Sequence, residues 1–547
     1  MDTKDEFCEY YQDLLNEKYD CVDRLVLNAY FIAAQSTGGF RLWWRRLMGN
    51  DDTLDNTHLM RLAGKFSRRT HAYAAKNKIP IIICPQGERK HEIAEKYLPQ
   101  KPAFQGVFCI LVGRAPAPIF DVRKFKNGAI DIKKKTPYVN YYHFHIIDPD
   151  WGHIIIKLCS HPPFTAQIIL NGHEYVAIQA RKQKISFTKE DNCFTVIDDA
   201  AGMAKIADTM KASGFVGRLV QVCERWIYST CLCFALDQDE QQKSGFRYSY
   251  SVYQAEYSRN LLFIRGTTME QLFQSIIDRT RAPLNIKTVK TIFGYKYRPY
   301  HKDKQGKRPR VEAVVERPVY NLTTFKVHFG NLTVKIYSKG ERVLRIESIA
   351  HNAKELLCGR TIDKFPRIVE ALKAMLERFL NILQSIDASF IGAETIEAWP
   401  LPSKVGACRV GGIDANRPRM RAIMEAVISL SPKPEGFTAS EVADKVKQIT
   451  GNFHYEARHA SYDLKKLRGK KLVKRKDYSR RYQSTADGLK SMTAFMVLRD
   501  KVMLPLLARA GKRKYGRKPR KLSEIDFHYE NIQIEMQNIF KFLNIVA

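Results

Sequence analysis

The chain has 547 residues, 45% of them hydrophobic and 11% aromatic, a composition that excludes intrinsic disorder as its main state. Its 90 Lys and Arg against 57 Asp and Glu give a formal net charge of +33, an excess that favours an anionic partner such as nucleic acid. No segment approaches the roughly 18 consecutive apolar residues of a transmembrane helix, and the acidic N-terminus is unlike a signal peptide. We therefore expect a soluble, cytoplasmic protein with no membrane partner.

The first hundred residues form a predicted helical N-terminal region. Apolar side chains recur there at three- and four-residue spacing in segments 6–19, 58–76 and 90–97, which is the pattern of amphipathic helices.

Residues 101–285 are predicted to be the first part of a central α+β core. Short β-branched and aromatic runs bounded by turn formers indicate strands, and Asp148 to Gly152 (DPDWG) indicates a hairpin turn between two of them. Helical spacing returns at 173–184 and 200–213, and the run FRYSYSVYQAEYSRNLLF (246–263) continues the strands. We expect an antiparallel sheet.

Residues 286–396 are predicted to be a second, basic and β-rich part of the core that ends in a long helix at 362–386. Alternating residues predict strands at 325–329 and 334–336 and a tight turn at 338–341. Before them, a basic run from Lys287 to Arg317 includes three tyrosines, and such runs can neutralise phosphates and stack on bases. Its expected nucleic-acid contacts are Lys296, Arg298, Lys307, Arg308 and Arg310. The alternative is a solvated loop whose tyrosines pack inward.

Residues 397–419 are rich in Pro and Gly and predict a linker. From residue 405 onward there are 30 Lys and Arg against 14 Asp and Glu, so this quarter of the chain has a net charge of +16. Residues 491–547 are predicted to form a basic helical tail.

Residues 420–490 resemble a winged helix-turn-helix. Helical patterns near 420–430, 438–449 and 455–467 precede two short basic strands, and a cap-like Thr438-x-x-Glu441 opens the second helix. Off the apolar stripe of the third helix, where a recognition helix would meet a major groove, lie Tyr455, Arg458, His459, Tyr462, Lys465 and Lys466. The basic ribbon adds Lys474, Arg475, Arg480 and Arg481. The alternative is a protein-binding or packing module.

A first candidate for catalysis is His143-Phe-His145, on a predicted strand whose two imidazoles share a face. It resembles the metal-binding motif of HUH endonucleases, which cut single-stranded DNA through a tyrosine. Tyr253 and Tyr257 have the Tyr-x-x-x-Tyr spacing such a nuclease uses, although their segment alternates like a strand. The alternative is two half-buried histidines beside nearby carboxylates.

A second candidate is the strand–turn–strand from Val334 to Glu347. It resembles a segment of Rep_trans-type rolling-circle replication initiators, in which Tyr-x-Lys-Gly precedes Arg-x-Glu. The resemblance implies roles for Tyr337 and Lys339 and a metal-binding carboxylate at Glu347; Ser338 stands where the family more usually has Asp.

For that reaction the expected cofactor is Mg²⁺ or Mn²⁺, because hard cations prefer carboxylate oxygens. Glu256, with Asp148 or Asp150 as further candidates, would complete the ligand set. Tyr257, Tyr337 or water would be the nucleophile. The alternative is a charged hairpin in which Glu347 pairs with Lys335 or Arg345. No CxxC pair, Walker P-loop, GxSxG or HExxH is present, so no zinc ribbon and no nucleotide or organic cofactor is indicated.

Most of the chain resembles a family of long bacterial proteins often found beside mobile elements. The resemblance is carried by segments such as PFTAQIILNGHEYVAIQ (163–179), DNCFTVIDD (191–199) and YQAEYSRNLLF (253–263). It implies a mobile-element setting and supplies no mechanism.

The expected function is binding of DNA, RNA or both for such an element, with metal-dependent nicking of DNA. The alternatives are a non-catalytic RNA-binding protein and a transcription regulator. The sequence carries no signal for the oligomeric state.

Overall fold

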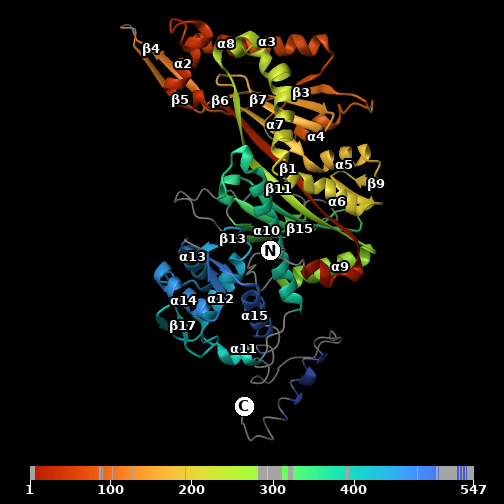
Figure 1. The fold of residues 1–547 in the computed structure, drawn as a ribbon, viewed down its shortest axis with the longest axis vertical. Helices are drawn as coiled ribbons and strands as arrows, with labels where there is room; N and C mark the ends of the chain where they lie inside the picture. The colour runs from red at the N-terminus through yellow and green to blue at the C-terminus, as the bar shows by residue number, and fades with distance from the viewer. Residues whose placement is uncertain are drawn as a thin grey trace. The chain divides into compact units, whose positions relative to one another are not determined.

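The computed structural model describes residues 6–280, 292–293, 311–317, 324–388 and 393–499, apart from residues 86, 87, 89, 102, 126, 128, 191, 330, 340, 477 and 478, together with positions 503, 527, 528, 530–532, 534, 535 and 538 (Figure 1). The chain divides into two compact units. The sheet unit consists of Leu14–Met269 and Gly330–Leu376, and the C-terminal unit consists of Met1–Asp13, Glu270–Phe329 and Glu377–Ala547. These units cut across the predicted boundaries at 100, 285 and 396.

The sheet unit is built on one large sheet. The strands of this sheet that belong to the unit run in the order β15-β16-β11-β1-β8-β7-β6-β3-β2. Neighbours are antiparallel except β2 and β3, which are parallel, so the sheet is mixed. The bounds are β1 (Leu15–Phe31), β2 (Ile81–Ile83), β3 (Gly106–Pro116), β6 (Tyr138–Asp148), β7 (Gly152–Cys159), β8 (Ala166–Asn171), β11 (Tyr248–Phe263), β15 (Leu332–Lys339) and β16 (Val343–Ala350).

Helices and two hairpins complete this unit. The hairpins are β4 (Ile119–Lys124) with β5 (Ile130–Lys135), and β9 (Phe187–Glu190) with β10 (Cys193–Ile197). The helices are α2 (Thr37–Met48), α3 (Asn56–Lys76), α4 (Lys90–Glu95), α5 (Gly172–Lys182), α6 (Ala200–Asp208), α7 (Phe215–Trp226) and α8 (Gln238–Ser244). Both α9 (Gly266–Thr280) and α10 (Phe365–Ala388) run from one unit into the other.

The predicted helical N-terminal region is wrong in one essential part, because it contains the central strand of the sheet. The helix expected at 6–19 ends after α1 (Glu6–Tyr10), and β1 starts at Leu15. β1 pairs with β11 on one side and with β8 on the other (Figure 1). These long-range strand pairings decide the conformation of residues 15–31, because pairing on both sides stabilises a strand more than a local helical spacing stabilises a helix. The helices predicted at 58–76, 90–97 and 173–184 are confirmed as α3, α4 and α5.

The two faces of the sheet differ in character. On one face, Phe144 of β6 packs against Phe66 of α3, and the Ser348 hydroxyl of β16 donates to the Leu372 carbonyl of α10, which places the apolar core there. We call the opposite face the polar face, since His143, His145, Glu256 and Glu347 alternate onto it. At the β16 end, α5 and the β9–β10 hairpin lie on the polar face, where Arg345 contacts His173 of α5 and donates to the Asn192 carbonyl of the hairpin turn.

Within the described residues, the C-terminal unit contains a three-stranded sheet of order β19-β21-β20 and the helices that surround it in the sequence. The bounds are α11 (Ala393–Ala398), β17 (Ser403–Val405), β18 (Cys408–Val410), α12 (Pro418–Leu430), β19 (Phe437–Thr438), α13 (Ala439–Thr450), α14 (Ala457–Gly469), β20 (Val473–Arg475), β21 (Arg481–Ser484) and α15 (Ala486–Leu498). The Thr438/Glu441 capping box opens α13, which confirms that prediction. Earlier in the chain lie β12 (Ile292–Phe293), β13 (Val311–Arg317) and β14 (Thr324–Phe329).

The predicted linker at 397–419 is folded. Its β17–β18 hairpin packs against α14 so closely that a side chain at Gly469 would meet Ser403. The five basic residues predicted as contacts between 296 and 310 lie outside the described residues, as does most of the tail after 499. Among the described helices, none is long and apolar enough to cross a membrane.

Candidate functional site

A cluster of charged side chains occupies the polar face where β15, β16 and β11 meet. Because alternate residues of a strand share a face, Glu256, Ser258 and Asn260 of β11 lie on this side. On β16, Glu347 stands opposite Ser258 and Arg345 opposite Asn260, while Lys335 of β15 stands opposite Glu347. Glu256 and Glu347, which the sequence predicts to belong to one metal-binding set, lie on the same face of the sheet.

Glu347 is buried and already holds several partners. The Tyr337 hydroxyl donates to its Oε1 over 2.5 Å, Lys335 Nζ donates to its Oε2 over 3.2 Å, and Arg345 Nη1 lies 3.6 Å from Oε1. The charged-hairpin alternative, in which Glu347 pairs with Lys335 or Arg345, is therefore what the structure shows. The Lys335 ammonium already pairs with Glu347, and its charge also acts on Glu256, so these residues do not fit a resident Mg²⁺ or Mn²⁺.

Glu256 has a different environment. It lies on the wall of a cleft and accepts a hydrogen bond from Gln254 Nε2 over 2.7 Å. Burial and then the negative charge of Glu347 raise the pKa of Glu256 to about 7, against the opposing charge of Lys335. A carboxyl group with this pKa can both take and give a proton near neutral pH.

A bulge in β1 explains how residues far apart in sequence meet Glu256. Val22 pairs with Tyr257 and Leu25 with Ala255, so Asp23 and Arg24 together face the single residue Glu256. Such a bulge re-aims side chains. Asp23 is buried, whereas Arg24 is exposed and lines the same cleft as Glu256.

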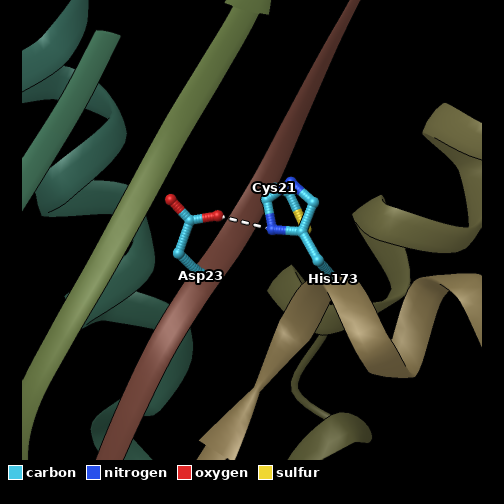
Figure 2. A group of neighbouring side chains, drawn as sticks. All are labelled: Cys21, Asp23 and His173. Atoms are coloured by element: carbon cyan, nitrogen blue, oxygen red, sulfur yellow. Dashed lines mark ion pairs between the residues drawn. The ribbon is translucent and has the colours of Figure 1, made fainter. Parts of the chain in front are cut away.

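Asp23 belongs to a buried network with His173 and Cys21 (Figure 2). His173 Nδ1, at the start of α5, lies 2.6 Å from Asp23 Oδ1. A His173 ring nitrogen, an Asp23 carboxylate oxygen and Cys21 Sγ all lie within 4.8 Å of one another. His173 Nε2 lies 3.3 Å from Arg345 Nη2, and because guanidinium only donates, this ring nitrogen accepts and the ring proton is on Nδ1. Although burial raises it, the pKa of Asp23 is held below its usual range by His173 and Arg345, while burial lowers the pKa of His173.

These three side chains could in principle ligate a metal, but the surroundings favour an ionic network. Burial raises the pKa of the Cys21 thiol well above its usual range, and a cation there would lie beside the Arg345 guanidinium. The Asp23 anion is instead balanced by Arg345.

Tyr257 is not part of the site on the polar face. It is adjacent to Glu256 in β11 and therefore points to the opposite side of the sheet. There its hydroxyl donates to Asp20 Oδ2 over 2.8 Å, and Arg259 Nη2 donates to the same oxygen over 2.8 Å. Burial followed by the charge of Asp20 raises the pKa of Tyr257 well above its usual range, so the prediction of Tyr257 as a nucleophile beside Glu256 is wrong.

The cleft at Glu256 has a volume of about 1680 Å³ and extends along the polar face to His143 and His145. Strands β1, β8 and β7 separate these histidines of β6 from Glu256 of β11. His145 Nδ1 lies 3.0 Å from His153 Nε2, and burial lowers the pKa of both His143 and His145 to about 3. The structure thus does not bring His143 and His145 together with Glu256, Glu347 or Tyr257. Lys339 also lines the cleft and donates to Asn192 Oδ1 over 2.7 Å.

A second candidate surface lies on α14 in the C-terminal unit. The side chain of Arg458 is 77% exposed and lies 3.0 Å from Glu456, Tyr462 is 52% exposed, and Lys466 Nζ lies 5.1 Å from the centre of the Tyr462 ring. Lys465 is half-buried. We call Arg458, Tyr462, Lys465 and Lys466 the α14 surface. On the neighbouring strands and their turn, Lys474, Arg475 and Arg480 are exposed.

Two predicted contacts of this region are turned inward. Tyr455 precedes α14, is buried, and donates its hydroxyl to Asp463 Oδ2 over 2.8 Å beneath the Arg419 guanidinium. Arg481 is half-buried, lies 3.7 Å from Glu441 and donates to the Gly436 carbonyl. Tyr455 therefore stabilises the unit and does not present its hydroxyl to a ligand.

Sequence reasoning missed Asp23, His173 and Asn192. These residues are distant from Glu347 in the sequence and meet the charged cluster only because the chain folds back on itself. No protein-family model, curated protein or solved structure matches the chain.

Proposed function

We propose that the protein binds nucleic acid through a winged helix-turn-helix formed by residues 420–490. The single observation that carries this proposal is the exposed basic α14 surface beside the basic β20–β21 ribbon. Three helices followed by a small antiparallel sheet are the elements of such a domain, with α14 as the recognition helix and the ribbon as the wing.

The chemistry of the α14 surface suits a phosphate-lined groove. Arg458 and Lys466 can neutralise phosphates or reach base edges, and Tyr462 offers a ring between them. The apolar residues Ala460, Leu464 and Leu467 occupy the other side of α14 and are fully buried, whereas Arg458 and Tyr462 are exposed to a ligand. Duplex DNA is the partner we favour, and the resemblance to bacterial mobile-element proteins adds the proposal that it belongs to such an element.

The test is a triple variant, Arg458→Ala with Tyr462→Ala and Lys466→Ala, measured by fluorescence anisotropy on duplex DNA. A matched control, Arg123→Ala with Tyr138→Ala and Lys133→Ala, removes the same residue types from exposed positions of the sheet unit, where these side chains are 65%, 58% and 63% exposed. We expect the first variant to lose affinity on the order of 10- to 100-fold, and the control to bind like the parent. An equal loss of affinity in both variants would show that only the net charge matters, and it would refute a specific binding surface.

Sequencing the nucleic acid that co-purifies with the full chain separates the alternatives. DNA enriched for one site supports DNA recognition, whereas one structured transcript would replace it with the RNA-binding alternative. Binding only upstream of genes whose expression changes would favour a transcription regulator.

We propose phosphodiester cleavage in the cleft as a second function, favoured by Glu256. Arg24 and Lys339 line the cleft with it and would bind the scissile phosphate. Water would attack phosphorus while the Glu256 carboxylate takes its proton, the P–O bond to the leaving group would break, and Glu256 would return the proton to that oxygen. No step is assigned to a metal ion, because the Lys335 ammonium already pairs with Glu347 and its charge acts on Glu256.

For this second function we expect Glu256→Gln to abolish nicking of single-stranded, duplex or RNA substrates while binding is preserved. The control Glu95→Gln changes an exposed carboxylate of the same cleft and should leave nicking unchanged. Nicking that survives in Glu256→Gln, or that is absent from the parent, would eliminate this function.

A further inference from the structure

A separate pocket of about 400 Å³ lies on the polar face, at the end of the sheet away from Glu256. Its floor is formed by β1, β8, β7 and β11, and its walls by Phe120 of β4 and by prolines such as Pro118 and Pro163. The volume falls within the range of small-molecule sites, and apolar walls around a few polar groups are their usual composition.

The floor carries a row of polar side chains across neighbouring strands. Ser251 of β11 stands opposite Asn28 of β1, Asn28 opposite Gln167 of β8, and Gln167 opposite Lys157 of β7. Gln167 Nε2 donates to Asn28 Oδ1 over 3.0 Å, and both residues line the pocket, where the pair can still offer Asn28 Nδ2 as a donor and Gln167 Oε1 as an acceptor. The row continues to His143 of β6, on the wall of the large cleft.

The charges around this pocket have one sign. Lys134, Lys157 and Arg360 line it, and among the described residues no carboxylate does. Lys157 Nζ lies 4.5 Å from the centre of the Tyr141 ring, and burial together with the charge of Lys90 lowers the pKa of Lys157. No carboxylate of the described chain pairs with Lys157 or Arg360. A partly buried ammonium without a counter-ion costs stability, and an anion bound beside it would remove that cost.

We propose that this pocket binds one nucleotide, with its phosphate on Lys157, its base over the amide row between the aromatic and proline walls, and Arg360 against the base at the β11 end of that row. The nucleotide comes either free or as one unit of a single strand that continues along the polar face towards His143. This inference goes beyond the α14 surface, since the pocket lies entirely in the sheet unit.

The test measures binding of AMP, adenosine and inorganic phosphate to the full chain by isothermal titration calorimetry. Variants are Lys157→Met, which keeps the apolar stem, and the exposed Arg360→Met. Lys133→Met is the control, because Lys133 neighbours Lys134 on β5 but does not line the pocket. We expect AMP to bind more tightly than adenosine, and each of the two pocket variants to lose on the order of tenfold in AMP affinity while the control loses none.

Competition by a single-stranded trinucleotide identifies the source of the ligand. Displacement of AMP by the trinucleotide supports a strand, and AMP binding without such displacement supports a free nucleotide. Equal affinities of AMP and adenosine, no AMP binding, or unchanged binding in Lys157→Met and Arg360→Met would each overturn the proposal. The Arg458/Tyr462/Lys466 triple variant should bind AMP like the parent, so the two proposals fail independently.

Discussion

Replacing Glu256 with Gln should stabilise the protein at high pH and have little effect at low pH. The carboxyl group has a pKa of about 7 in the folded chain against an ordinary value of 4.5, so the folded state holds its proton more tightly than the unfolded state. Its protonated form therefore favours folding below pH 4.5, and this advantage is lost as pH rises towards 7. The difference between the two pKa values corresponds to about 3 kcal/mol in the free energy of unfolding.

The assay is urea unfolding of the parent and Glu256→Gln between pH 4.5 and 8.5, followed by tryptophan fluorescence. Trp43, Trp44, Trp151 and Trp226 lie in the sheet unit and Trp399 in the C-terminal unit, so the signal comes mainly from the unit that holds Glu256. Gln is neutral at every pH and close to Glu in shape. The gap between the two proteins should grow from near zero at pH 4.5 to about 3 kcal/mol at pH 8.5.

Glu95→Gln serves as the control, because Glu95 is exposed and should give no pH-dependent gap. A constant gap between parent and Glu256→Gln at all pH values, or a variant that is less stable than the parent at pH 8.5, would refute the reasoning. Either result would mean that Lys335 compensates the ionised Glu256 fully.

Three further outcomes follow from the contacts. Arg345→Met should lower the free energy of unfolding by about 3–5 kcal/mol, because Asp23 would stay buried without its cation and Glu347 would keep only Lys335 as a cation. The control Arg342→Met, at an exposed position, should change it by less than about 0.5 kcal/mol in the same urea assay. Tyr455→Phe should destabilise the C-terminal unit by about 1–2 kcal/mol in thermal unfolding, because the hydrogen bond to Asp463 is lost. Its DNA affinity should stay within about twofold of the parent. A large loss of affinity at unchanged stability would show that Tyr455 contacts the DNA after all. Phe453→Ala should lower DNA affinity without lowering stability, because Phe453 precedes α14 and is 81% exposed. Fluorescence anisotropy measures the affinity, and a melting curve measures the stability.

Local patterns predicted much of the secondary structure. The alternation of residues 334–347 predicted a hairpin whose alternate side chains share a face, and this placed Lys335 and Glu347 together, as found. The same rule separates Tyr257 from Glu256 once residues 253–257 are recognised as a strand, because adjacent residues point to opposite faces. The four-residue spacing of Tyr253 and Tyr257, which is typical of a helix, thus led to the wrong position for the nucleophile, although the alternation of a strand was visible in the sequence.

The remainder of the site depends on pairings over long distances. Asp23, His173 and Arg345 are separated by 150 residues or more and meet only because β1 is the central strand and contains a bulge opposite Glu256. Local spacing carries no information on such a pairing. Tyr455 was likewise predicted to be exposed, because its partners are the buried Asp463, two turns later on α14, and the exposed Arg419 of α12.

The most direct test of nucleic-acid binding is the salt dependence of duplex affinity for the parent and for the Arg458/Tyr462/Lys466 variant. With six to ten phosphate contacts, the affinity of the parent should fall on the order of 10³- to 10⁵-fold between 50 and 200 mM salt. The variant lacks two cations, so the slope of log affinity against log salt should be shallower by about 2. A flat response of the parent, or identical slopes for both proteins, would contradict binding through the α14 surface.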